Sequence, residues 1–199
     1  MSIARSGALA LATVLAVMAP TSAHAGTYHH SDAAHDVVTF TDDDGHVTAA
    51  PDRANGDIVT SGVTYGSKRV TLAMKYAAID QSEDLAEHFF SIVTSKGKVR
   101  TFLLLASSNH PQGSLIRTTG RGKKFSCKGV HWSIGYGARI VSLSVPARCL
   151  GEPKWVRGAM LSLDVDDFAP DNPPAFLDDS NTTGFTDDST PRYGPRVYH

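Results

Sequence analysis

Short catalytic motifs are missing from this sequence of 199 residues. It contains no G-x-S-x-G, no H-E-x-x-H and no P-loop, the patterns that identify common hydrolases and nucleotide-binding proteins. The segment Ser95-Lys96-Gly97-Lys98 matches S-x-x-K, but the companion motifs of that catalytic group are absent. The sequence therefore favours a non-catalytic protein. A secreted hydrolase with a site assembled from distant residues is the alternative.

A surplus of one charge sign and a membrane-spanning apolar run are lacking as well. The formal net charge is −1, so no global field favours nucleic acid. The apolar run 8–19 is shorter than the roughly twenty residues that a transmembrane helix needs. Arg5 precedes this run, and Ala23-His24-Ala25 follows it as an A-x-A cleavage site. The pattern predicts a signal peptide over 1–25 and a secreted protein without a membrane span. An uncleaved N-terminal anchor is the alternative.

Cysteine is scarce, because Cys127 and Cys149 are the only two. The residues between them alternate between apolar and polar around the reversal 135–138, which predicts a β-hairpin. The inward residues of the hairpin are expected to be Val130, Trp132, Ile134, Val141, Leu143 and Val145. Pairing about this turn brings the two cysteines close together, so we predict a disulfide, which persists in exported proteins. The chain-entropy model assigns such a loop roughly 3 kcal/mol of stabilisation.

Helical periodicity is nearly absent, and Ile79–His88 is the one helix-like stretch. About nine or ten short strands with frequent turn signals predict an antiparallel β-sandwich, jelly-roll-like, over 36–168. The clearest alternation predicts that Val70, Leu72, Met74 and Tyr76 face inward. In the last long strand, Trp155–Val165, the residues expected to face inward are Leu161, Leu163 and Val165.

The two flanks of this domain lack periodicity. Residues 26–35 are small, polar and histidine-rich, and we expect a flexible segment. Residues 169–199 are rich in proline and aspartate, and we expect a disordered tail that is dispensable for folding. The tail repeats a short motif, first at Phe176–Ser180 and again at Phe185–Ser189. A linear binding motif and a drifting duplication are both open interpretations.

Two groups of residues are candidate metal ligands, although we expect no obligatory cofactor. Neutral imidazoles of His29, His30 and His35 are suitable ligands for copper or zinc. Carboxylates suit calcium, and they occur in two acidic groups, Asp42, Asp43 and Asp44 and then Asp164, Asp166 and Asp167. Neither acidic group has the spacing of an EF-hand loop, and acidic turns are commonly only solvated.

Aromatic and basic residues are the candidate binding groups. Trp155 at a strand start, Tyr136 at a turn and Tyr76 near a strand end are placed to contact sugar rings. For Trp155 a core position is the competing interpretation, and for Trp132 we predict one. Several predicted hairpins also have a cationic rim that suits an anionic envelope polymer but also discourages sheet-to-sheet aggregation. Its members are Lys68, Arg69, Lys96, Lys98, Arg100, Arg121, Lys123 and Lys124.

One succession of segments resembles a known group of proteins. Its members are Gly56–Ile58, Val70–Leu72, Val141–Pro146, Cys149–Gly151 and Trp155–Arg157. This succession is similar to small secreted bacterial proteins whose domains resemble the jelly-roll sandwiches of DOMON-like and family-9-like carbohydrate-binding modules. The resemblance covers about 57–165 and rests on the rhythm of the strands. It implies a secreted, non-catalytic module that binds a glycan or a cell-envelope polymer. An extracellular structural or protein-interaction domain is the alternative, and the oligomeric state is open.

Overall fold

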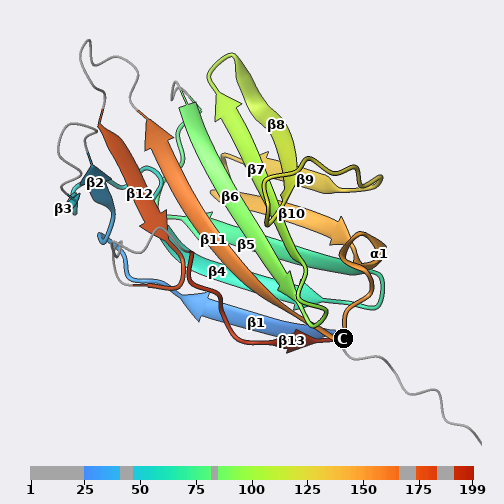
Figure 1. The fold of residues 1–199 in the computed structure, drawn as a ribbon. Helices are drawn as coiled ribbons and strands as arrows, with labels where there is room; N and C mark the ends of the chain where they lie inside the picture. The colour runs from blue at the N-terminus through green and yellow to red at the C-terminus, as the bar shows by residue number, and fades with distance from the viewer. Residues whose placement is uncertain (1–24, 41–46, 82–84, 166–173, 183–190) are drawn as a thin grey trace, which may run out of the picture.

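The computed structural model describes residues 25–40, 47–81, 85–165, 174–182 and 191–199, and every structural statement below refers to them. They form two antiparallel β-sheets stacked face to face (Figure 1). The described residues contain thirteen strands and one four-residue helix, α1 (Ala147–Leu150). The predicted antiparallel β-sandwich is therefore confirmed, with more strands than expected. The described part of the chain contains no helix with the length and apolar character needed to cross a membrane.

The first sheet has five strands in the order β1-β4-β5-β10-β9. Their bounds are β1 (Gly26–Ser31), β4 (Ile58–Tyr65), β5 (Arg69–Tyr76), β10 (Ile140–Pro146) and β9 (His131–Gly135). The second sheet follows the order β3-β2-β12-β11-β6-β7-β8, and β13 pairs with β11. Its strands are β3 (Val47–Ala49), β2 (Val38–Phe40), β12 (Ala175–Asp179), β11 (Trp155–Val165), β6 (Leu85–Thr94), β7 (Val99–Ser107), β8 (His110–Thr119) and β13 (Val197–Tyr198).

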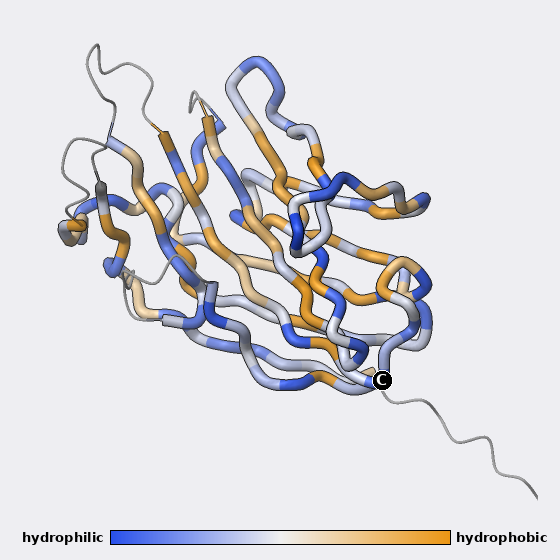
Figure 2. Tube along the Cα trace, in the orientation of Figure 1, coloured by the Kyte–Doolittle hydropathy of each residue, from blue (hydrophilic) through white to orange (hydrophobic). Residues whose placement is uncertain are grey.

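The core lies between the two sheets, where every second residue of each central strand is buried. Val70, Leu72, Met74 and Tyr76 of β5 are all buried, as the alternation predicted. They meet the apolar residues of the second sheet, which are Phe90, Ile92, Phe102, Leu104 and Met160. Figure 2 shows the hydrophobic stretches along β11, β6 and β7, whereas the turn between β7 and β8 is hydrophilic.

Gly158 of β11 lets the two sheets approach closely. A Cβ atom there would lie 2.7 Å from a methyl group of Val63 and 3.0 Å from one of Leu72. Both distances are shorter than van der Waals contact between carbon atoms, so a larger residue would push the sheets apart.

The disulfide-closed hairpin is confirmed. Residues of β9 and β10 pair from Ile140 with Gly135 to Ser144 with His131, and Cys127 is bonded to Cys149 with Cα atoms 5.8 Å apart. This separation lies within the range that disulfides require. The predicted core position of Trp132 is wrong, because its side chain is 38% exposed. β9 is the edge strand of its sheet, and the indole Nε1 of Trp132 donates to the Gln112 carbonyl at 2.9 Å.

Both segments expected to lack structure contribute strands. Residues 26–31 form β1, which pairs with β4 along its whole length. Residues 175–179 form β12, which is inserted between β2 and β11. The expectation of a flexible N-terminal segment and a disordered tail is therefore wrong for these residues. The first copy of the tail repeat contributes β12, and the second copy lies outside the described residues.

Two further sequence predictions are corrected. The helix-like stretch Ile79–His88 is not a helix where it is described, because its last four residues begin β6. The inward face of β11 was assigned in the wrong register, since Met160, Ser162 and Asp164 are buried and Leu161, Leu163 and Val165 are half-buried. Alternation identifies the two faces of a strand, but here the buried face carries the polar residues Ser162 and Asp164.

Candidate functional site

Charge is divided unequally along the chain. Between His88 and Gly151 there are ten lysines and arginines and no aspartate or glutamate. All 20 acidic residues lie outside this stretch, which explains how a net charge of −1 arises. Net charge alone therefore conceals a strongly basic region and a strongly acidic remainder.

The basic stretch occupies one side of the sandwich. It forms most of β6 and all of β7, β8, β9 and β10, which lie toward the same lateral edge of both sheets (Figure 1). The opposite edge consists of β1 in the first sheet and of β2, β3 and β12 in the second. The segregation along the sequence therefore becomes a segregation in space, with a cationic edge formed by β7 to β10.

Five cations, which we call the basic cluster, come from the turn between β6 and β7, from the start of β7 and from the segment after β8. They are Lys98, Arg100, Arg121, Lys123 and Lys124. The first three line a hollow of about 400 Å³, together with Gly97, Val99, Thr119 and Gly120. The Gly120 amide donates to the Val99 carbonyl at 3.1 Å and fixes the two turns against each other.

Arg100 is held in place at this hollow. Its guanidinium lies 4.9 Å from the centre of the Phe125 ring, and Nη1 donates to the Val99 carbonyl at 3.0 Å. Among the described residues, none of the five members of the basic cluster lies within salt-bridge distance of a carboxylate. Their charges are therefore available to an anionic ligand.

The three aromatic residues predicted to bind sugar do not form one surface. Tyr76 is 1% exposed, and its hydroxyl lies 2.9 Å from Nδ1 of His88 inside the core, so its assignment to a binding surface is wrong. Tyr136 is half-buried and donates its hydroxyl to the Pro111 carbonyl at 2.8 Å. Trp155 is half-buried beneath the guanidinium of Arg196, 4.5 Å from the ring centre. Trp155 begins β11, whereas Tyr76 lies near Asp164 at the other end of that strand.

The fold does not bring the three predicted histidine ligands together at one site. His29 lies against Gly62, whereas the His30 ring stacks on Tyr28 with centroids 6.2 Å apart. Nδ1 of His35 lies 2.8 Å from the Pro51 carbonyl. The acidic candidates Asp42, Asp43, Asp44, Asp166 and Asp167 fall outside the described residues.

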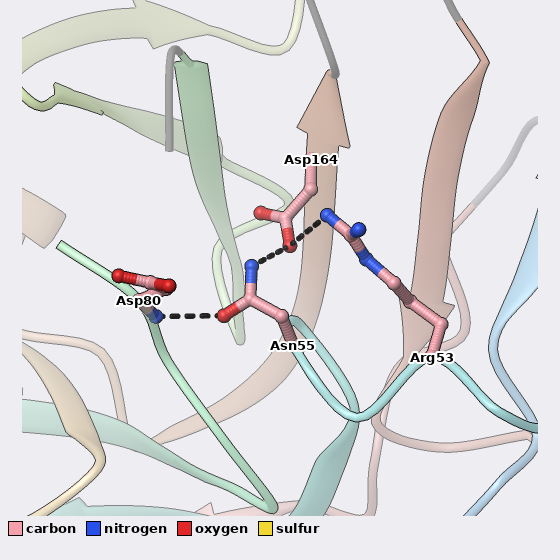
Figure 3. Close-up of polar contacts among 4 residues, drawn as sticks. All are labelled: Arg53, Asn55, Asp80 and Asp164. Carbon is pink, nitrogen blue, oxygen red and sulfur yellow. Dashed lines mark hydrogen bonds and ion pairs between the residues drawn. The ribbon is translucent and has the colours of Figure 1, made fainter. Parts of the chain in front are cut away.

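Asp164, the remaining acidic candidate, is bound by protein groups. Its Oδ2 accepts a hydrogen bond of 2.7 Å from Nδ2 of Asn55 and lies 4.0 Å from the guanidinium of Arg53 (Figure 3). Asn55 is itself oriented by the Asp80 amide, which donates to its side-chain oxygen at 2.7 Å. This acid is therefore compensated within the protein.

A second acidic group was missed by the sequence reasoning. One carboxylate oxygen from each of Asp36, Asp57 and Asp178 lies within 4.8 Å of the others. Asp36 precedes β2, Asp57 directly precedes β4, and Asp178 lies in β12. Because three distant segments supply the acids, no local spacing in the sequence indicates the group.

Burial dominates the electrostatics of this acidic group. The pKa of Asp178 is raised to about 8, mainly by burial and to a smaller extent by the carboxylates of Asp32, Asp36 and Asp57. Burial likewise raises the pKa of Asp32 to about 7, with a smaller contribution from Asp36. The pKa of Asp57 is raised for the same first reason, desolvation of the charged form.

Comparison with known proteins does not supply an identity. The chain matches no protein-family model, and it is significantly similar to no curated protein and to no solved structure. Any functional inference therefore rests on the residues and geometry described above.

Proposed function

We propose that the protein is a secreted, non-catalytic binding module for an anionic polymer of the cell envelope. The observation that carries this proposal is the acid-free stretch between His88 and Gly151, whose ten cations lie toward one edge of the sandwich. Clustered positive charge attracts polyanions and increases the rate of their association. The predicted signal peptide supports a location where such polymers occur.

The basic cluster is the proposed contact site within this edge. Its hollow of about 400 Å³ is in the size range of ligand sites. Arg100, oriented by Phe125 and the Val99 carbonyl, offers donors in a fixed geometry that suits carboxylate, sulfate or phosphate oxygens. The lysines add positive charge on exposed turns, where a long polymer is able to follow them.

Retention on immobilised heparin tests the proposal, with neutral dextran as the uncharged comparator. The double variant Arg121→Ala/Lys123→Ala removes two exposed charges from the basic cluster. We expect binding about threefold to tenfold weaker, since an exposed ionic contact contributes about 0.2–1 kcal/mol. The matched control is Lys68→Ala/Lys75→Ala, which makes the same change in net charge at exposed residues of the first sheet.

Two outcomes would contradict the proposal. Equal weakening by both double variants would mean that total charge, not the basic cluster, determines retention. Binding to duplex DNA that is as tight as binding to heparin would replace an anionic glycan with nucleic acid as the ligand.

A further inference from the structure

Three acids lie close together at the edge opposite the basic cluster, and two of them are buried. Asp36, Asp57 and Asp178 each place one carboxylate oxygen within 4.8 Å of the other two. Oxygens bound to one Ca²⁺ at about 2.4 Å are at most about 4.8 Å apart, and the three carboxylate oxygens meet this pairwise limit. The set contains only hard oxygen donors, which suit Ca²⁺ or Mg²⁺ rather than zinc or copper.

Two of these side chains are buried, and each has one carboxylate oxygen without a hydrogen-bond partner among the described residues. Asp57 is 0% exposed and Asp178 is 1% exposed. Oδ2 of Asp57 accepts a hydrogen bond of 3.0 Å from the His35 amide, and Oδ2 of Asp178 accepts one of 2.6 Å from the Ile58 amide. The other oxygen of each, Oδ1, is buried and has no hydrogen-bond partner among the described residues. A buried carboxylate oxygen without a donor is costly, which indicates a partner other than protein.

Neighbouring acids show how this protein compensates carboxylates that need no ion. Asp164 has Asn55 and Arg53 beside it (Figure 3). Asp179 accepts hydrogen bonds from the amides of Asn181 and Arg192, at 3.0 and 3.2 Å. By contrast, no lysine or arginine in the described part of the chain pairs with Asp57 or Asp178.

We propose that Asp36, Asp57 and Asp178 bind one Ca²⁺. The oxygens Oδ1 of Asp57 and Asp178 are the buried ligands, and water completes the coordination that Ca²⁺ requires. Asp32, whose Oδ2 is also buried without a hydrogen-bond partner, adds negative charge beside the ion. Ca²⁺ is favoured over Mg²⁺ because Mg²⁺ needs shorter bonds in a near-ideal octahedron.

The ion would connect three parts of the chain that are distant in sequence. It would join the segment before β2 and the start of β4 to β12 near the C-terminus. Calcium therefore contributes to the docking of β12 as well as neutralising the acids.

Calorimetric titration of the chelator-treated full chain with CaCl₂ is the direct test. We expect one Ca²⁺ per chain, with weaker binding of Mg²⁺. At a free Ca²⁺ concentration 100-fold above Kd, the melting temperature is expected to rise by about 5 °C or more. Absence of Ca²⁺ binding, or binding of Mg²⁺ tighter than that of Ca²⁺, would overturn the proposal.

Three variants assign the site. Asp178→Asn keeps an oxygen acceptor for the Ile58 amide, and Asp36→Asn changes a residue that is only half-buried, so at least one of them should fold. Each is expected to weaken Ca²⁺ binding at least tenfold and to abolish the Ca²⁺-dependent rise in melting temperature. Asp52→Asn, at an exposed position, is the matched control and should bind as the parent does. Unchanged binding in both Asp36→Asn and Asp178→Asn would place the ion elsewhere.

Discussion

His88 lies between the two sheets, 1% exposed, with Nδ1 2.9 Å from the hydroxyl of Tyr76. Burial lowers its pKa to about 4, because the charged imidazolium is desolvated there. The folded protein therefore keeps this ring neutral at pH values where the unfolded chain, with a pKa near 6.5, already binds a proton.

This difference predicts a loss of stability on acidification. Since the unfolded state binds more protons between about pH 6.5 and pH 4, stability falls as the pH falls through that window. Relative to His88→Gln, which does not titrate, the parent is expected to lose on the order of 2 kcal/mol between pH 7.5 and pH 4.5. Urea unfolding of both proteins at the two pH values measures it.

The comparison isolates the histidine because both proteins retain the same aspartates. Those acids have raised pKa values and act in the opposite direction, stabilising the fold as the pH falls. A stability difference between parent and variant that does not depend on pH would show that folding leaves the pKa of His88 at its unfolded value.

Single residues also show what the sequence reasoning was able to predict. The alternation in β5 placed Met74 and Tyr76 inward correctly, and the same alternation already argued against Tyr76 as a surface residue. The acids were not predictable in this way. In the sequence, Asp57 stands at the start of a predicted strand and Asp178 lies in the tail expected to be disordered, and only tertiary pairing brings them into the interior.

Individual strands were predictable where their partners are close in sequence. The hairpin of β9 and β10 has a local turn, a clear period of two and a disulfide across its base. β12 has none of these signals, because its partner β2 is remote in sequence, its other partner β11 is not joined to it by a short turn, and two of its buried residues are aspartates. Local pattern therefore identified the hairpin and missed the strand.

We expect β12 to make the C-terminal region important for stability, because it pairs with β11 on one side and with β2 on the other. Removing residues 174–199 would expose the hydrogen-bonding edge of β11 and separate β2 and β3 from the second sheet. We expect the melting temperature of this truncation to fall by more than about 5 °C, on the order of 1 kcal/mol or more at this chain length.

Calorimetry of the truncated and parent chains measures that effect. Removal of only Tyr198 and His199, which are exposed, is the control and should produce a smaller fall. A truncation at 174 with the melting temperature of the parent would mean that β12 contributes nothing to stability.

At the scale of the whole molecule, the cationic edge and the acidic remainder should attract each other between copies. The formal net charge of −1 gives almost no overall repulsion to oppose this contact. Light scattering is expected to show a larger apparent mass at about 10 mM NaCl than at about 300 mM, since salt screens charges beyond the Debye length.

Reversing two charges of the basic cluster tests whether this cluster causes the association at low salt. Arg121→Glu/Lys123→Glu should remain monomeric at low salt, whereas Lys68→Glu/Lys75→Glu should still associate. An apparent mass that does not change with salt would show that the two charged regions do not meet.

The segregation of charge can be seen in the sequence, although the net charge does not reveal it. Only the fold shows that the basic segments lie side by side.

The position of β12 also has a consequence for how the protein acquires its structure. Phe40 of β2 pairs with Ala175, so β2 and β3 cannot join the second sheet until that late segment has been synthesised. Pairing between residues so distant in sequence slows folding, and domains otherwise begin to form from the N-terminus as the chain is made. The nascent protein therefore carries β2 and β3 unpaired with the second sheet, and an open edge of β11, until residues 175–179 have been synthesised.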